Sequence, residues 1–228
     1  MLLLFILKII NTKLVYLTKE EVEELKKTNT KNKKVFIFDL DDTLYDFSTP
    51  LENKHSKNKE ELIEKYRKVK DVSKLSKEYR KEYGITLIGL LDCCSVEEIL
   101  NESTYKTFKG FSLPKNDELK ILLDEIKGDK WIFSNNQLNI TENLLQEMGI
   151  LENFEFVFGP NLNNYPVICK PFISAFRLLD SLVKSRKYSN VYFFDDQNEN
   201  IEKGKCVGWE SKLCNHRNIL EILESFVD

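Results

Sequence analysis

The chain has 228 residues and a formal net charge of -3, with acidic and basic residues mixed along its length. That length suits one domain of moderate size or a core with an insertion. Because no basic face dominates, the composition does not favour a nucleic acid polymer as the partner. The five cysteines include no Cys-x-x-Cys pair, so they indicate neither a zinc site nor a disulfide framework and fit a reducing, cytoplasmic setting.

The first segment is strongly apolar from residue 1 to residue 7 and is interrupted by Lys8. A membrane-spanning helix needs about 20 apolar residues, and a secretory signal has a basic start and a small-residue cleavage site. The segment matches neither pattern, so we do not expect membrane contact. A short amphipathic or buried extension over 2–17 and a weak membrane anchor remain open.

Thr18 and Glu21 form a capping box, which predicts a helix that begins at Thr18 and runs to about Lys27. We therefore expect residues 1–33 to form an N-terminal extension with one helix. An apolar run then predicts the first buried strand over 35–39.

Asp39 and Asp41 stand two residues apart at the end of this strand. Alternation along an extended chain places both side chains on one side and turns Leu40 away. Two carboxylates this close repel each other unless a cation lies between them or one of them holds a proton. The spacing therefore indicates a metal site, an acid/base pair, or both.

The composition changes after Tyr45, and no buried strand is predicted before about residue 108. Leu62, Tyr66 and Val69 recur at helical spacing, and a second capping box begins at Ser95. We expect several helices here, in an insertion that leaves the sheet domain and rejoins it.

The rest of the chain alternates helical and strand patterns, which is typical of an α/β fold with a mostly parallel sheet covered on both faces. Helices are predicted over 117–127, 138–148, 171–183, 198–203 and 219–226, and strands over 130–134, 154–158 and 191–194. Pro171 is expected in the first turn of its helix, where a missing N–H costs little.

Polar side chains follow three of the predicted strands. They are Asp39 and Asp41, then Ser134 and Asn135, then Asp195 and Asp196. In a parallel sheet these strand ends meet at one edge, and Lys170 stands just before a helix. Carboxylates of this kind, together with phosphate and water, are ligands that Mg²⁺ prefers.

These residues give the chain its resemblance to the haloacid dehalogenase superfamily, in which phosphatases dominate. The four motifs of that superfamily are matched in order by Asp39-Leu40-Asp41-Asp42-Thr43, Ser134-Asn135, Lys170-Pro171 and Phe194-Asp195-Asp196. Many members insert a helical cap between the first motif and the rest. The resemblance implies a Rossmann-like parallel sheet core over 34–47 and 110–228, with a helical cap over 48–109.

The resemblance also implies catalytic roles. Asp39 is the expected nucleophile, since a carboxylate can form an aspartyl-phosphate that divides one hard step into two. Asp41 is expected to protonate the leaving oxygen and then to activate water; members that cleave carbon–halogen bonds lack this second acid. Lys170 is expected to neutralise charge on the nucleophile and the phosphoryl group. Asp42 is expected to be a turn residue.

We expect Asp39, Asp41, Asp195 and Asp196 to form the Mg²⁺ site. In this assignment Asp41 contributes its backbone carbonyl, Asp196 binds the metal directly, and Asp195 orients Lys170 or a metal-bound water; the sequence leaves open which of the last two is the direct ligand.

The predicted substrate-binding residues are Thr43, Ser134 and Asn135. Ser134 would hold a phosphoryl oxygen, assisted by the backbone N–H of Asn135, and Thr43 would support the loop.

A finer resemblance suggests a substrate. The segment 82–90 is similar to a Tyr-Gly…Gly-Leu segment of the pyrimidine 5'-nucleotidase branch, and Cys169-Lys170-Pro171 also matches that branch. It implies a small-molecule partner, a nucleoside 5'-monophosphate. Tyr45, Phe47 and Tyr83 would either stack on the base or pack between cap and core.

Three alternatives stay open. They are hydrolysis of a phosphosugar, hydrolysis of lysophosphatidate, and a catalytically silent relative that binds phosphate ligands. The two histidines, His55 and His216, show no partner spacing and are expected at the surface or in packing. The sequence does not indicate an oligomeric state.

Overall fold

A computed structural model describes residues 12–28, 30–47 and 51–227. Its centre is a six-stranded sheet in the order β1-β4-β3-β2-β5-β6, and every pair of neighbouring strands is parallel. The strands are β1 (Lys13–Tyr16), β2 (Lys34–Phe38), β3 (Asp129–Phe133), β4 (Phe156–Gly159), β5 (Asn190–Asp195) and β6 (Glu210–Leu213). The predicted α/β fold with a parallel sheet is confirmed.

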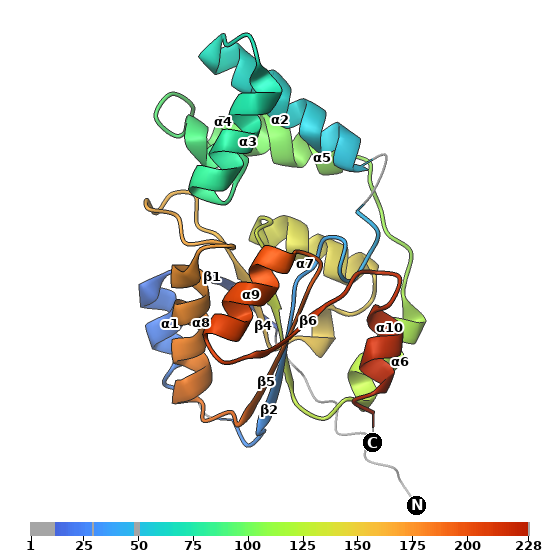
Figure 1. Ribbon diagram of the computed structural model, residues 1–228. Coiled ribbons are helices and arrows are strands. Elements are labelled where there is room, and N and C mark those ends of the chain that lie inside the picture. Colours follow the sequence, from blue (N-terminus) through green and yellow to red (C-terminus); the bar gives the residue numbers. More distant parts are fainter. Residues whose placement is uncertain (1–11, 29, 48–50, 228) are drawn as a thin grey trace, which may run out of the picture.

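Helices cover both faces of the sheet (Figure 1). They are α1 (Lys19–Leu25), α6 (Asp117–Glu125), α7 (Leu138–Glu147), α8 (Ile173–Ser185), α9 (Asn198–Cys206) and α10 (Ile219–Glu224). Alternation along β2 explains the two layers. Phe36 and Phe38 pack in a cluster with α6, α7 and α10, whereas Val35 and Ile37 pack with α1, α8 and α9.

The segment 13–25, expected to lie outside the core, belongs to the sheet domain. β1 pairs with β4 at the edge of the sheet, and α1 packs beside α8 on the second face. The predicted N-terminal helix cap at Thr18 is present, since the Thr18 hydroxyl accepts a hydrogen bond from the Glu21 N–H at 3.3 Å. Residues 1–11, which hold most of the apolar segment, lie outside the described residues.

Two edge strands escaped prediction for a physical reason. β1 and β6 have four residues each, and each pairs with one neighbour only. β6 reads Glu-Ser-Lys-Leu, with no buried residue, so no apolar run marks it. Short edge strands of this kind depend on pairing with the adjacent strand.

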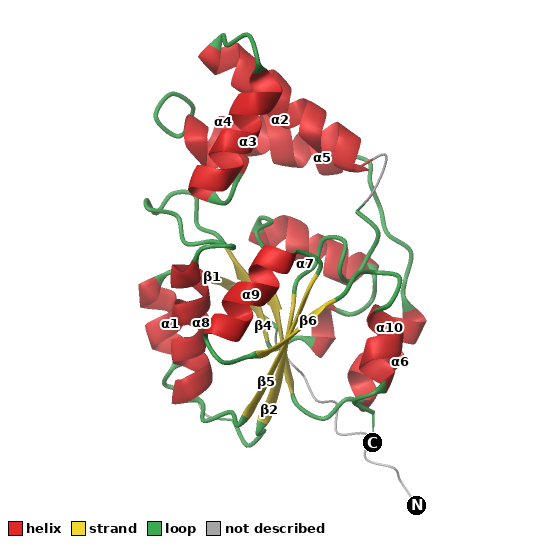
Figure 2. Cartoon of the chain, in the orientation of Figure 1, coloured by secondary structure: helices red, strands yellow, loops and turns green. Residues whose placement is uncertain are grey.

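A second unit, formed only by helices among its described residues, stands at one end of the sheet (Figure 2). It contains α2 (Leu51–Arg67), α3 (Val72–Tyr83), the 3₁₀ turn η1 (Thr86–Leu90), α4 (Val96–Ile99), the π-helical turn η2 (Leu100–Tyr105) and α5 (Lys106–Phe108). It has its own apolar cluster, which includes Leu62, Ile63 and Leu90, and residues Leu162 and Cys169 of the sheet domain join that cluster. We propose that this unit is the cap predicted over 48–109, and we call it the cap. Of the helices in the described ranges, none has the length and apolar character to cross a bilayer.

Candidate active site

Asp39, Lys170 and Asp195 come from distant parts of the chain and meet at the end of β2 and β5. The Lys170 ammonium lies 2.6 Å from Asp39 Oδ1 and 2.7 Å from Asp195 Oδ2. Asp39 itself is positioned by its N–H, which donates to the Phe194 carbonyl at 2.8 Å. Because β2 and β5 are parallel neighbours, their carboxyl ends bring the two acids together.

Lys170 is held at both its backbone and its side chain. The Asn135 side chain donates to the Lys170 carbonyl at 2.8 Å and accepts from the Lys170 N–H at 3.0 Å. The ammonium lies 5.2 Å from the centre of the Phe133 ring. Burial favours the neutral amine, but the charges of Asp195 and Asp39 outweigh it and raise the pKa of Lys170. This lysine is therefore a fixed, protonated cation.

The helix after Lys170 begins later than predicted. α8 starts at Ile173, with Phe172 as its N-terminal cap residue, so Pro171 precedes the helix instead of occupying its first turn. The Asn135 side chain takes up the Lys170 carbonyl, which a helix beginning at Pro171 would have used as an acceptor.

The two acids of the last motif have different surroundings. Asp195 is fully buried, and its oxygens accept from Lys170, from the Asn200 amide and from the Gln197 N–H. Asp196 is half-buried and lines an open cleft, where it accepts from the Gln197 side chain. Burial and the neighbouring Asp195 raise the pKa of Asp196 to about 6. This geometry favours Asp196 as the acid that faces a ligand and Asp195 as the acid that orients Lys170.

Three carboxylates are placed to hold a cation. Ligand oxygens of Asp39, Asp195 and Asp196 all lie within 4.8 Å of one another. Burial raises the pKa of Asp39 well above its ordinary range, and Lys170 only partly offsets this. Three crowded acids with one ammonium leave negative charge uncompensated, and a donor set made only of oxygen suits a hard divalent cation such as Mg²⁺.

Asp41 has partners of its own. Its carboxylate accepts from the Tyr45 hydroxyl and, at 3.5 Å, from the Asn136 amide. Burial raises the pKa of Asp41 to about 6, against the opposing effect of the Tyr45 hydrogen bond. The Asp41 carboxylate is not part of the group formed by Asp39, Asp195 and Asp196, and a metal contact through its backbone carbonyl stays a prediction. A carboxyl group with this pKa suits proton transfer near neutral pH.

The three predicted substrate-binding residues lie close to this centre but differ in exposure. Thr43 is fully buried and donates to Asp39 Oδ2 at 3.2 Å. Ser134 is 2% exposed, and its hydroxyl accepts from the Asn136 N–H at 3.0 Å. Asn135 lines the cleft and positions Lys170. Thr43 therefore positions the Asp39 carboxylate, and contact of Ser134 with a phosphoryl group stays a prediction.

Asp42 occupies the expected turn. Its φ is 59°, a left-handed conformation that Asp tolerates better than most residues. Its side chain accepts from the Phe47 N–H at 3.0 Å and its carbonyl accepts from the His216 N–H at 2.8 Å. These bonds fold residues 42–47 back beside the cleft.

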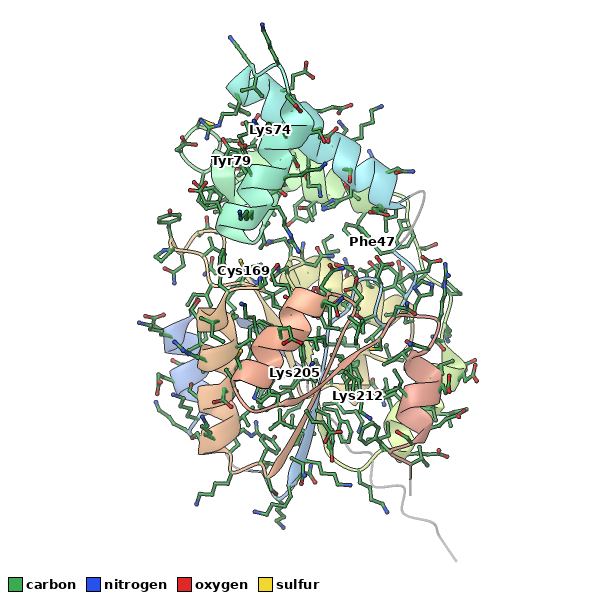
Figure 3. All side chains as sticks on the ribbon, in the orientation of Figure 1. Phe47, Lys74, Tyr79, Cys169, Lys205 and Lys212 are labelled. Atoms are coloured by element: carbon green, nitrogen blue, oxygen red, sulfur yellow. The ribbon has the colours of Figure 1, made fainter. Side chains whose placement is uncertain are left out.

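The site opens into a cleft of about 610 Å³ between the sheet domain and the cap. Of the aromatic residues considered for base stacking, Phe47 lines this cleft, together with His55 of α2. Figure 3 shows Phe47 and Cys169 at the junction of the two units. Tyr45 instead holds Asp41, and the Tyr83 ring packs edge-on to Tyr79, 5.8 Å between centres, within the cap. Neither tyrosine lines the cleft, which favours the packing alternative for Tyr83 and a positioning contact with Asp41 for Tyr45.

The cap also touches the lysine motif directly. Gly84 has a φ of +76°, and a Cβ at this position would lie 2.7 Å from the Lys170 carbonyl oxygen and 2.9 Å from Cys169 Sγ. The Cys169 thiol lies 3.3 Å from the Tyr83 carbonyl. The Tyr-Gly segment that carries the finer resemblance is thus a joint between cap and core, where a side chain does not fit.

Sequence reasoning missed several residues of the site. The four-residue spacing of Asp41 and Tyr45 was a usable signal for their hydrogen bond. Asn136 and Asn200, which hold Asp41 and Asp195, carry no local pattern that separates them from surface asparagines. His55 was expected at the surface or in packing; it lies 3.4 Å from the Thr107 hydroxyl and on the cleft wall.

The fold is similar to that of solved haloacid dehalogenase-like proteins. A solved haloacid dehalogenase-like family hydrolase from Xanthomonas campestris matches with a TM-score of 0.55 and 8% identity, over 88% of this chain and 95% of that one. At this identity the likeness shows the fold, and the predicted fold is confirmed. No family model matches the chain.

One curated relative shares more sequence. The chain is 28% identical over 196 residues to Phosphate metabolism protein 8 of Saccharomyces cerevisiae. The matched segment covers 77% of this chain and 60% of that protein. The chain therefore spans about three fifths of the length of this relative.

Proposed function

We propose that the protein is a Mg²⁺-dependent phosphomonoester hydrolase that acts through an aspartyl-phosphate at Asp39. The observation that carries the proposal is the Lys170 ammonium, buried between Asp39 and Asp195 at 2.6 and 2.7 Å. These three residues and Asp196 on the cleft wall supply a nucleophile, a fixed cation and oxygen ligands within one small space.

In the first step, Asp39 attacks the phosphorus atom and the bond to the leaving oxygen breaks. Thr43 and Lys170 each bind one Asp39 oxygen and so hold the carboxylate in one orientation. Lys170 also offsets the negative charge that the transferring phosphoryl group spreads over its oxygens.

Asp41 serves as the general acid and then as the general base. With a pKa raised to about 6, a useful fraction of its carboxyl groups holds a proton near neutral pH. It donates this proton to the leaving alkoxide and later accepts one from the water that attacks the phosphoenzyme. The Tyr45 and Asn136 hydrogen bonds keep its side chain in place.

The groups that would hold Mg²⁺ are the carboxylates of Asp39 and Asp196 and the backbone carbonyl of Asp41. Asp195 would orient Lys170 beside them. When bound, the ion would offset the charge of the crowded carboxylates and of the phosphoryl oxygens. The oxygen-only donor set near Asp39 supports this choice.

For the substrate we propose a nucleoside 5'-monophosphate, with pyrimidine nucleotides first. Support comes from the segment 82–90 and from the cleft, whose volume of about 610 Å³ falls in the range of small-molecule sites. Phe47 on the cleft wall offers a ring against which a base can pack.

Two assays test the proposal. Hydrolysis of p-nitrophenyl phosphate with and without Mg²⁺ tests the reaction class, and metal-dependent turnover is the expected result. A panel of UMP, CMP, sugar phosphates and a lysophosphatidate then ranks substrates by kcat/KM. Lack of turnover would favour a phosphate-binding relative without activity, and UMP and CMP no better than sugar phosphates would remove the nucleotide assignment.

A further inference from the structure

The cap wall of the cleft is basic. Four cationic side chains from α2 and α3 line the same cleft as Asp39 and Asp196: Lys59, Lys77, Arg80 and Lys81. The core wall, in contrast, carries the acidic cluster described above. The two walls therefore have opposite charge and face one shared space.

Some cationic side chains of the cap have an acidic partner, whereas these four have none among the described residues. Elsewhere in the cap, Lys57 and Lys106 both pair with Glu61, at 3.8 and 2.9 Å, and Lys65 pairs with Glu98. Within residues 12–28, 30–47 and 51–227, no carboxylate stands at ion-pair distance from any of the four wall cations. Arg80 donates to the Gly84 carbonyl, which leaves its charge uncompensated.

Lys59 and Arg80 also act on each other. Burial lowers the pKa of Lys59, and the charge of Arg80 lowers it further, against the weaker opposing effects of Glu52 and Glu60. The pKa of His55 is lowered by burial and by both Lys59 and Arg80. The three groups thus lie close enough to repel; Lys59 and His55 are half-buried, where a cation loses hydration, and Arg80 is exposed.

Bringing like charges together without a counter-ion costs free energy, and a bound anion would offset that cost. The scissile phosphate of the proposed reaction is already matched on the core wall, by Lys170 and the metal ligands. If the scissile phosphate binds at the core wall, the leaving group of the substrate extends toward the cap wall, where the four cations lie. An anion on the leaving group is the chemistry that fits them.

We propose that Lys59 and Arg80, with Lys77 and Lys81 beside them, bind a second anionic group on the leaving-group part of the substrate, a carboxylate or a phosphate. This inference rests on the proposed function for the position of the scissile phosphate. Among the proposed nucleoside 5'-monophosphates, it favours those that carry a second negative charge, so UMP and CMP are expected to bind more weakly than their doubly anionic relatives.

The test is equilibrium binding to the Asp39→Asn protein with Mg²⁺, which does not depend on turnover. Calorimetry compares UMP with orotidine 5'-monophosphate, which adds a carboxylate, and with uridine 3',5'-bisphosphate, which adds a phosphate. At least one of the two doubly anionic ligands should bind about tenfold or more tightly than UMP, as one charge-assisted hydrogen bond provides. The ligand that binds more tightly shows whether the cap cations prefer a carboxylate or a phosphate.

Lys59→Gln in the same background should remove this gain, and Arg80→Gln is the second variant, with its melting temperature recorded because Arg80 also binds Gly84. Lys57→Gln is the matched control, since Lys57 lies on α2 two positions away and pairs at the surface with Glu61. It should keep the gain.

Three outcomes would overturn the inference: no gain from either added anion, a gain that survives both variants, or an equal loss for UMP and the doubly anionic ligands, which would mean that the cations only draw the cap toward the core. If the unmodified protein hydrolyses no phosphomonoester, the proposed function fails, while the binding comparison still decides the role of the cap cations.

Discussion

The cations on the two walls of the cleft differ in whether they have acidic partners. On the core wall, the one buried ammonium is matched by two carboxylates within 2.7 Å. On the cap wall, the charge of Arg80 lowers the pKa of Lys59 more strongly than Glu52 and Glu60 raise it. A cation held between two acids is preorganised for a reaction, whereas cations without an acidic partner are complementary to an anion that the chain does not contain.

The two walls also differ in the secondary structure that carries their side chains. The core side chains stand at the ends of parallel strands, which are packed on both faces and hold their positions firmly. The cap side chains stand on helices whose own cluster is small and is completed by Leu162 and Cys169 from the core. We expect the core to determine the reaction and the cap to determine selectivity.

The largest expected effect tests the core wall. Asp39→Asn removes the nucleophile and should lower kcat by about 10⁴-fold, measured with the best substrate of the panel at saturating Mg²⁺. The circular dichroism spectrum should not change, because an amide has the same shape. Substantial remaining turnover would rule out covalent catalysis at this position.

A pair of lysine variants tests the comparison itself. Lys170→Met leaves Asp39 and Asp195 buried against each other and should lower the free energy of unfolding by about 3–5 kcal/mol. Lys59→Met removes a cation that has no acidic partner and should change it by less than about 1 kcal/mol. Urea unfolding in the presence of a metal chelator measures both. Equal losses in the two variants would contradict the contrast between the walls.

A pair of glycine variants tests the joint between the walls. Gly84→Ala places a methyl group 2.7 Å from the Lys170 carbonyl, whereas Gly110, with a similar φ of +74°, has open space around its Cβ position. Both variants pay the cost of a left-handed alanine, about 1–2 kcal/mol. Gly84→Ala should lose about 1–3 kcal/mol more through overpacking, and its kcat should fall because Lys170 moves.

The comparison uses urea unfolding and steady-state kinetics on both proteins. If Gly84→Ala and Gly110→Ala are equally stable and equally active, the contact of the cap with the lysine motif has no consequence for the site.

The smallest expected effect is a pH dependence on the cap side. Burial, Lys59 and Arg80 lower the pKa of His55 from 6.5 to about 3. Between these values the unfolded chain binds a proton that the folded chain does not, so stability is retained above pH 6.5 and falls as the pH decreases toward 3.

His55→Gln should remove this contribution. The loss of stability between pH 7 and pH 6, measured by urea unfolding, should be about 0.7 kcal/mol smaller in the variant than in the unmodified protein. The same loss in both proteins would mean that His55 is not held in its neutral form.

Much of the core could be predicted from local patterns. The runs before Asp39, Ser134 and Asp195 are apolar over their whole length, which is typical of strands buried on both faces. Because parallel strands end at one edge, the acids after β2 and β5 had to meet. Thr18 and Ser95 could be assigned as helix caps from the acid three residues later, and both accept the expected N–H.

Other parts could not be predicted because their signals are not local. β6 has no apolar run, and β1 lies in a segment that also fits an extension. The different surroundings of Asp195 and Asp196, adjacent in sequence, depend on which side chain turns toward Lys170 and Asn200.

The amino-acid sequence by itself determined the parallel α/β core and the meeting of Asp39, Lys170 and Asp195, because strand ends and motif order constrain these positions. The tertiary structure alone decided the cap wall, where cations of two helices gather without an acidic partner among the described residues, and the contact of Gly84 with Lys170, which are 86 positions apart. Helix packing angles and the placement of one unit on another arise from many weak contacts summed over the molecule, and no short stretch of sequence carries that sum.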